Sequence, residues 1–135
     1  MPKLPRAQTI LLPILRAAHP DVTFTTWGED IDYRKFPTVN LRRIDGYRNP
    51  TAPELHGLPI IEMTAYGDEG LPETEELYED CLETLYRAHK RQTRTPAGYI
   101  SSFRETMGAT QFSSPFQDSW RIQGLFVVGV RPPRK

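Results

Sequence analysis

The chain has 135 residues, the length of one ordinary domain. Its 17 lysines and arginines balance 17 aspartates and glutamates, which argues against a dedicated DNA-binding module, because such modules usually carry a basic excess. The single cysteine excludes an intramolecular disulfide and a cysteine-based zinc site, and no apolar run approaches the about 20 residues of a membrane span. We therefore expect one domain over residues 1–135, with no membrane segment, ending in a basic, proline-rich tail at 131–135.

The first elements along the chain are a helix and two strands. Apolar residues at helical spacing predict a helix over 9–18, with Thr9 as its N-cap. Threonine and aromatic residues alternate from Val22 to Thr26 and predict a strand. A second strand is expected over 36–44, with Val39 and Leu41 on one face.

The middle of the chain predicts a turn, a strand and the clearest helix. Asp45-Gly46 is a turn signal and opens a long irregular connection that lasts until Gly57. A third strand, apolar enough at its centre to be buried on both faces, is expected over 58–66. Residues 72–90 predict a helix, because acidic residues fill its first half, basic residues fill its end, and an apolar stripe including Cys81 runs along it.

The last third predicts two strands joined by a loop. After a linker at 92–98, a fourth strand is expected over 99–107 and a fifth over 119–130, with a loop at 108–118 between them. The order α-β-β-β-α-β-β indicates an α+β fold, in which two helices pack on a mixed or antiparallel sheet of about five strands.

The sequence offers little material for catalysis or metal binding. The glycine-rich phosphate loops, the HExxH zinc motif and the GxSxG nucleophile motif are all missing, and the three histidines lie in three different elements. Cys81 lies on the apolar stripe of the second helix, where a buried structural thiol is the favoured interpretation. Asp30 and Asp32 form a carboxylate pair without the rest of a calcium loop, so a solvated loop is favoured there.

Two features suggest contacts with other chains. The loop at 108–118 carries Phe112 and Phe116, which either fold back on the core or dock on another molecule. The last strand is apolar on both faces from Leu125 to Val130, whereas one layer of helices covers only one face of a sheet. A neighbouring subunit is a natural cover for the other face, and both features favour an assembly protein over a free enzyme.

Four segments carry a resemblance to a known family. They are Phe36-Pro37-Thr38-Val39-Asn40-Leu41-Arg42-Arg43-Ile44-Asp45-Gly46, Leu58-Pro59-Ile60-Ile61-Glu62, Leu77-Tyr78-Glu79-Asp80, and the stretch from Ser114-Pro115-Phe116-Gln117-Asp118-Ser119-Trp120-Arg121 to Val130-Arg131-Pro132. In this order they resemble the tail terminator proteins of long-tailed, non-contractile bacteriophages, in particular phages of actinobacteria. The resemblance spans about Leu11 to Pro132.

The resemblance implies a structural role in the virion. Proteins of this family form a ring, expected to be a hexamer, on the head-proximal end of the tail tube, where they stop tube polymerisation and offer a surface to the head connector. DNA passes through the lumen without specific binding. The resemblance implies no enzymatic activity, no cofactor and no metal. It places the protein in the neck region of the tail, after assembly in the host cytoplasm.

In the mechanism that this implies, each subunit adds its sheet to that of its neighbour, and a closed ring leaves no open growth edge. We expect the loops at 28–35, 47–57 and 108–118 to make the axial contacts. The interface candidates are Arg42, Arg43, Tyr47, Phe112, Pro115, Phe116, Trp120, Arg121, Leu125 and Val127.

Two alternatives stay open at the level of sequence. The nearest is another neck component, a head-closure or head-to-tail connector protein. The second is a small phage-encoded enzyme whose site is assembled from scattered residues, with Asp30, Asp32 and His56 as its best material.

Overall fold

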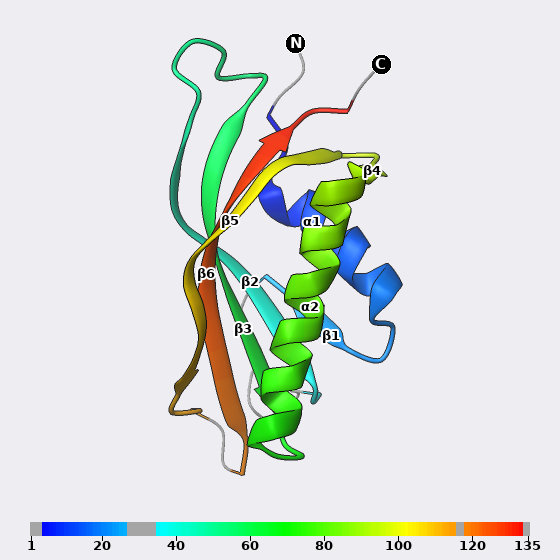
Figure 1. Ribbon diagram of the computed structural model, residues 1–135, viewed down its shortest axis with the longest axis vertical. Helices are drawn as coiled ribbons and strands as arrows, with labels where there is room; N and C mark the ends of the chain where they lie inside the picture. The colour runs from blue at the N-terminus through cyan, green and yellow to red at the C-terminus, as the bar shows by residue number, and fades with distance from the viewer. Residues whose placement is uncertain (1–3, 27–34, 116–117, 134–135) are drawn as a thin grey trace.

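The computed structural model places two helices on one face of a six-stranded sheet (Figure 1). The structure describes residues 4–26, 35–115 and 118–133. In chain order the elements are α1 (Ala7–Ala18), β1 (Thr23–Thr25), β2 (Thr38–Arg48), β3 (Gly57–Gly67), α2 (Leu71–Arg91), β4 (Arg94–Thr95), β5 (Gly98–Phe112) and β6 (Trp120–Arg131). The α+β class is confirmed. The additional strand is the two-residue β4, in the segment expected to be a linker.

The strands are ordered β1-β2-β3-β6-β5-β4 across the sheet. β1 runs parallel to β2, and all other neighbours are antiparallel. The two outermost strands are very short, because β1 has three residues and β4 has two. The sheet is therefore mixed, and four long strands, β2, β3, β6 and β5, make up most of it.

The core lies between the sheet and the helices. Tyr78, Cys81 and Leu85 of α2 are buried against the sheet residues Ile61 and Phe126, as the apolar stripe on this helix predicts. The burial of apolar surface in this layer is the main stabilising contribution, at about 25 cal/mol for each Å² removed from water. The other face of the sheet carries no helix (Figure 1).

The two long hairpins are more regular than the sequence predicts. Asp45-Gly46 is no turn, because β2 continues through it as far as Arg48, past a register shift between Arg43 and Asp45. Gly46 has a φ of +116°, and a Cβ there would collide with the backbone of Pro59 on β3. This position is therefore an irregularity inside a strand, which glycine permits.

The expected loop at 108–118 is likewise mostly strand. β5 runs on to Phe112, and its end pairs with β6 through Gln111 opposite Ile122 and Phe112 opposite Arg121. The pattern-based prediction ended the strand before Gly108, but pairing with β6 resumes beyond this glycine at Thr110, after three register shifts along β5. Of the three loops expected to make axial contacts, the one at 28–35 lies almost wholly outside the described residues.

The first helix begins two residues earlier than predicted, and Thr9 is not its N-cap. Arg6 occupies the cap position without a side-chain hydrogen bond, and the Thr9 hydroxyl donates to the Arg6 carbonyl oxygen at 2.6 Å. A threonine near a helix start can satisfy a backbone group from inside the helix as well as from its cap, and the sequence pattern does not separate the two cases.

Candidate assembly surfaces

The sheet face that points away from the helices, which we call the open face, carries six of the ten interface candidates. Register places Arg42 opposite Glu62, Tyr47 opposite Leu58, and Arg121 opposite Tyr66. It also places Leu125 beside Glu62 and Val127 beside Ile60. The neighbours in sequence of these residues, such as Leu41, Ile61 and Phe126, point into the core. The open face therefore unites Arg42, Tyr47, Arg121, Leu125 and Val127, and it includes Phe112, which lies opposite Arg121.

One half of the open face forms an apolar hollow of about 400 Å³. Its lining residues are Tyr47, Leu58, Ile60, Ser102, Phe103, Arg104, Thr106 and Val127. The expectation that the third strand is buried on both faces is wrong, because Ile60 is partly exposed here while Ile61 is fully buried. Leu58, Ile60 and Thr106 were not among the sequence candidates, although the alternation in residues 58–66 could have placed the first two on this face.

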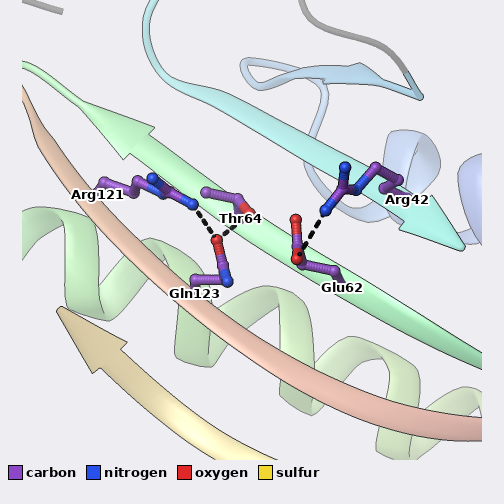
Figure 2. A network of polar contacts seen from close by, with 5 residues as sticks. All are labelled: Arg42, Glu62, Thr64, Arg121 and Gln123. Atoms are coloured by element: carbon purple, nitrogen blue, oxygen red, sulfur yellow. Dashed lines mark hydrogen bonds and ion pairs between the residues drawn. The ribbon is translucent and has the colours of Figure 1, made fainter. Parts of the chain in front are cut away.

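The other half of the open face is polar (Figure 2). The Thr64 hydroxyl donates to the Gln123 amide oxygen at 3.3 Å, and the Arg121 guanidinium donates to the same oxygen. Beside them, Arg42 forms an ion pair with Glu62 at 3.2 Å. The Arg42 side chain is 61% exposed, so this pair contributes little to folding stability and leaves the guanidinium accessible.

Arg121 also holds the end of β5. Its guanidinium carbon lies 5.3 Å from the centre of the Phe112 ring, which is the geometry of a cation–π contact. Phe112 is thus outside the core but covers its own chain, with 37% of its surface exposed. At the base of the connection to β6, the Ser114 and Ser119 hydroxyls share a hydrogen bond of 2.6 Å.

The remaining interface candidates are not brought into this cluster. Trp120 lies opposite Gly67 at the end of the sheet and is partly buried, and Pro115 is exposed in the β5–β6 connection. Arg43 is exposed and donates to the Asp45 carbonyl oxygen at 3.2 Å, apart from the open-face cluster. Phe116 lies outside the described residues.

Charge is separated along the length of the sheet, although the net charge is zero. At the end where α2 begins and Gly67 pairs with Trp120, acidic side chains predominate on the surface: Asp68, Glu69, Glu73, Glu75 and Glu76, with Lys35 as an exposed basic residue near them. At the end where α2 finishes and Tyr99 pairs with Arg131, they are basic: Arg48, Lys90, Arg91, Arg94 and Arg131. Burial and the Arg131 charge both lower the pKa of His56 near the basic end.

The described residues hold no arrangement suited to catalysis. Cys81 is fully buried, and burial together with the Asp80 carboxylate raises the pKa of its thiol to about 12, so it stays protonated. His19 shares a hydrogen bond with Thr84 at 2.8 Å, and His89 donates to the Ser101 carbonyl oxygen at 3.2 Å. Within these residues no group of three or more His, Cys, Asp or Glu side chains is placed to hold a metal ion.

Neither α1 nor α2 combines the length and apolar character that a membrane crossing requires. Asp30 and Asp32, the carboxylates of the enzyme alternative, lie outside the described residues.

Comparison with known proteins agrees with this absence of a chemical site. A family described as phage tail termination proteins matches residues 3–135. The chain belongs to this family. It is 61% identical to the Gene 22 protein of Mycobacterium phage L5 and 60% identical to that of Mycobacterium phage D29, and each alignment covers 99% of this chain and 98% of the relative. The resemblance to tail terminators of actinobacterial phages is confirmed, and the chain is a structural protein of a phage tail rather than an enzyme.

Proposed function

We propose that this tail termination protein forms a ring, expected to be a hexamer, on the head-proximal end of the tail tube, where it stops tube growth and presents a surface for head attachment. Family membership supports the terminating role. The structural observation that carries the proposal is the placement of two unlike hairpins at opposite ends of the molecule: the β2–β3 hairpin at one end and the β5–β6 connection at the other (Figure 1).

The two ends are suited to different partners. The β5–β6 connection lies at the acidic end, with Phe112 and Pro115 exposed. The β2–β3 hairpin lies at the basic end, with Tyr47 and Leu55 exposed. Large exposed apolar groups in a protruding segment are typical of contact surfaces. A ring of copies with parallel long axes would therefore carry one rim that fits the tube protein and a chemically different rim that fits the connector.

Termination follows from this asymmetry. A tube grows because every subunit presents, on its free rim, the surface to which the next subunit binds. A subunit whose second rim has different charge and shape accepts no further tube ring, so growth stops after one layer. DNA would then pass through the lumen of the ring without specific contacts.

The test is electron microscopy of particles made by a phage that carries a nonsense mutation in this gene, grown in a non-suppressing host. We expect free tails of abnormal and variable length, because nothing stops the tube. Tails of normal length beside unattached heads would contradict the terminator role and favour a connector role instead. Complementation with the intact chain from a plasmid is the control, and it should restore tails of normal length.

A further inference from the structure

Two long strand edges of this sheet have no partner within the described residues. β1 pairs with β2 at Thr38–Asn40 alone, so the outer edge of β2 is uncovered from Leu41 to Arg48. On the opposite side of the sheet, β4 pairs only with the first two residues of β5. A strand edge presents backbone N–H and C=O groups that can bind another strand.

The protein closes the beginning of the β5 edge and leaves the rest uncovered. The side-chain amide of Gln92, the residue after α2, donates to the Ile100 carbonyl oxygen at 3.0 Å, and the His89 ring of α2 donates to the Ser101 carbonyl oxygen at 3.2 Å. From Ser102 to Phe112 no described strand follows. This free stretch is about 36 Å long and that of β2 about 26 Å, at about 3.3 Å for each residue.

The composition of the β5 edge favours strand addition from Thr106 onward. Residues 106–117 contain no charge, although charged side chains are a common protection of exposed edges against pairing. The β2 edge is charged, with Arg42, Arg43, Asp45 and Arg48. The described residues include five exposed large apolar side chains, and three of them lie on these two strands: Ile44 at 42%, Tyr47 at 64% and Phe112 at 37%. A fourth, Tyr86, is hydrogen-bonded to Glu105 of β5. Apolar exposure is thus concentrated where the backbone edges are free.

We propose that the free edge of β5 (102–112) in one copy pairs in antiparallel fashion with the free edge of β2 (41–48) in the next copy. This inference rests on the ring proposed above and names the contact that would close it. β2 and β5 are separated by three antiparallel steps and run in opposite directions. Rotation about an axis along the strands keeps both directions, so the junction between copies repeats the antiparallel alternation of the sheet.

The two symmetric alternatives are less favourable. Pairing of β2 with a second β2 would bring Arg42 and Arg43 of each copy near Arg48 of the other, and like charges on facing strands are destabilising. Pairing of β5 with a second β5 would leave both β2 edges uncovered and would stop at a dimer. Pairing of β5 in one copy with β2 in the next uses both free edges of every copy, and of the three pairings it is the one that can close a ring.

Disulfide cross-linking in assembled tails tests the contact. Ile44→Cys on β2 is combined in turn with Thr106→Cys, Gly108→Cys or Thr110→Cys on β5, so that the three pairs sample neighbouring registers of the two strands. Facing Cβ atoms on paired strands are about 5 Å apart, close to the separation in a disulfide. The natural Cys81 is fully buried, so it gives little background. The variants are supplied from a plasmid to the phage with the nonsense mutation, and purified tails are oxidised and separated without reductant.

We expect at least one pair to give a ladder from dimer to higher multimers, while every single-cysteine variant stays monomeric. The matched control replaces the β5 cysteine with Glu76→Cys on the outer face of α2, and it should give no ladder. Dimers from Thr110→Cys alone would overturn the proposal in favour of β5–β5 pairing. Tails of normal length that contain the variants but show no ladder with any pair would also overturn it, while leaving the ring itself standing.

A cysteine that blocks assembly is still informative. The purified variant is then unfolded in urea beside the parent. The edge contact is supported if the cysteine variants on β2 and β5 lose assembly while their free energy of unfolding is unchanged, and if Glu76→Cys assembles normally. If Glu76→Cys loses assembly to the same extent as the edge variants, the proposed strand contact is overturned. Normal-length tails in the absence of this protein would refute the proposed function instead, and oxidation of the purified double variants would then decide the strand contact by itself.

Discussion

Gly124 shows how a single missing Cβ positions the long helix. A Cβ at this position on β6 would overlap the Tyr78 hydroxyl of α2 and lie 2.9 Å from the Met107 carbonyl oxygen. Tyr78 is 1% exposed, so it has no free space into which to move. We expect Gly124→Ala to lower the free energy of unfolding by about 1–3 kcal/mol, as overpacking of a core usually does.

Urea unfolding measures this loss, and Gly108→Ala is the matched control. Gly108 also lies in the sheet, on β5, but a Cβ there would meet nothing within 4 Å. The control should change stability by less than about 1 kcal/mol in either direction. Equal losses in both variants would show that glycine matters in these strands for its backbone and not for the space it leaves to Tyr78.

Phe112 is expected to matter for assembly more than for folding. Its ring covers Arg121 at the surface, and a cation–π contact at an exposed site contributes about 0.5–1 kcal/mol. Phe112→Ala should therefore cost about that much stability and abolish normal tail termination. Phe126→Ala, which removes a ring that is 1% exposed, should cost about 3–5 kcal/mol. A similar stability loss in both variants, with tails of normal length from Phe112→Ala, would assign Phe112 to the core.

These residues also mark the limit of sequence reasoning at this scale. The phenylalanines near the β5–β6 connection could be recognised as unusual, because large apolar groups are costly in water. That Phe112 stacks on Arg121 could not be predicted, since the partner is set by the register between two strands. The need for glycine at 124 is equally invisible, because it depends on the distance between a helix and a sheet.

At the scale of elements, Tyr86 joins α2 to β5. Its hydroxyl donates to a Glu105 carboxylate oxygen at 2.6 Å, and its ring meets Phe103 edge-on at 4.7 Å between centroids. The hydrogen bond to Glu105, with partial burial and the nearby carboxylates, raises the pKa of Tyr86 to about 12. Burial, followed by the Glu105 charge, also raises the pKa of Tyr78.

These contacts between α2 and β5 make the folding stability sensitive to high pH. Both tyrosines have a folded pKa above the ordinary value of about 10, so their contribution is complete below that pH and is lost as the pH rises toward 12 and beyond. We expect the free energy of unfolding to fall between about pH 10 and pH 12, and to fall less in Glu105→Gln, which lacks the carboxylate that opposes ionisation. Urea unfolding at a series of pH values measures this pH dependence. If the free energy of unfolding of Glu105→Gln falls with pH as steeply as that of the parent, the pH dependence does not come from the contact between Tyr86 and Glu105.

The elements themselves were predicted unevenly, for physical reasons. α2 was found almost to the residue, because an amphipathic stripe and an acid-to-base gradient are local properties. The ends of β2 and β5 were missed because Asp45-Gly46 and Gly108 are local signals for a turn. Hydrogen bonds to β3 and β6 override those signals, and such bonds join residues far apart in sequence.

At the scale of the whole molecule, the two hairpin ends should fail in different ways. Pro115→Ser combined with Phe112→Ala alters the acidic end, whereas Tyr47→Ser combined with Leu55→Ser alters the basic end. We expect the pair at the acidic end, which contains Phe112→Ala, to give tails of variable length, because the protein no longer binds the tube. The pair at the basic end should give tails of normal length that carry no head. Electron microscopy of complemented lysates separates the two outcomes.

The control for this comparison is the folding stability of each purified double variant. All four side chains are exposed, so the stability should stay within about 1 kcal/mol of the parent. Variable tail length from both pairs would mean that the two ends do not serve different partners, and it would contradict the model of two unlike rims.

The sequence by itself determined the class of fold, the absence of common catalytic motifs and the resemblance to tail terminators, because these depend on local periodicity and on the identity of residues in order. The tertiary structure decided which candidates share a surface. Arg42, Tyr47, Arg121, Leu125 and Val127 come from two distant strands, and only the pairing of both with β3 and its neighbours brings them to one face. It also decided that charge is separated between two ends and that two strand edges stay free, since both depend on the order of strands across the sheet and not along the chain.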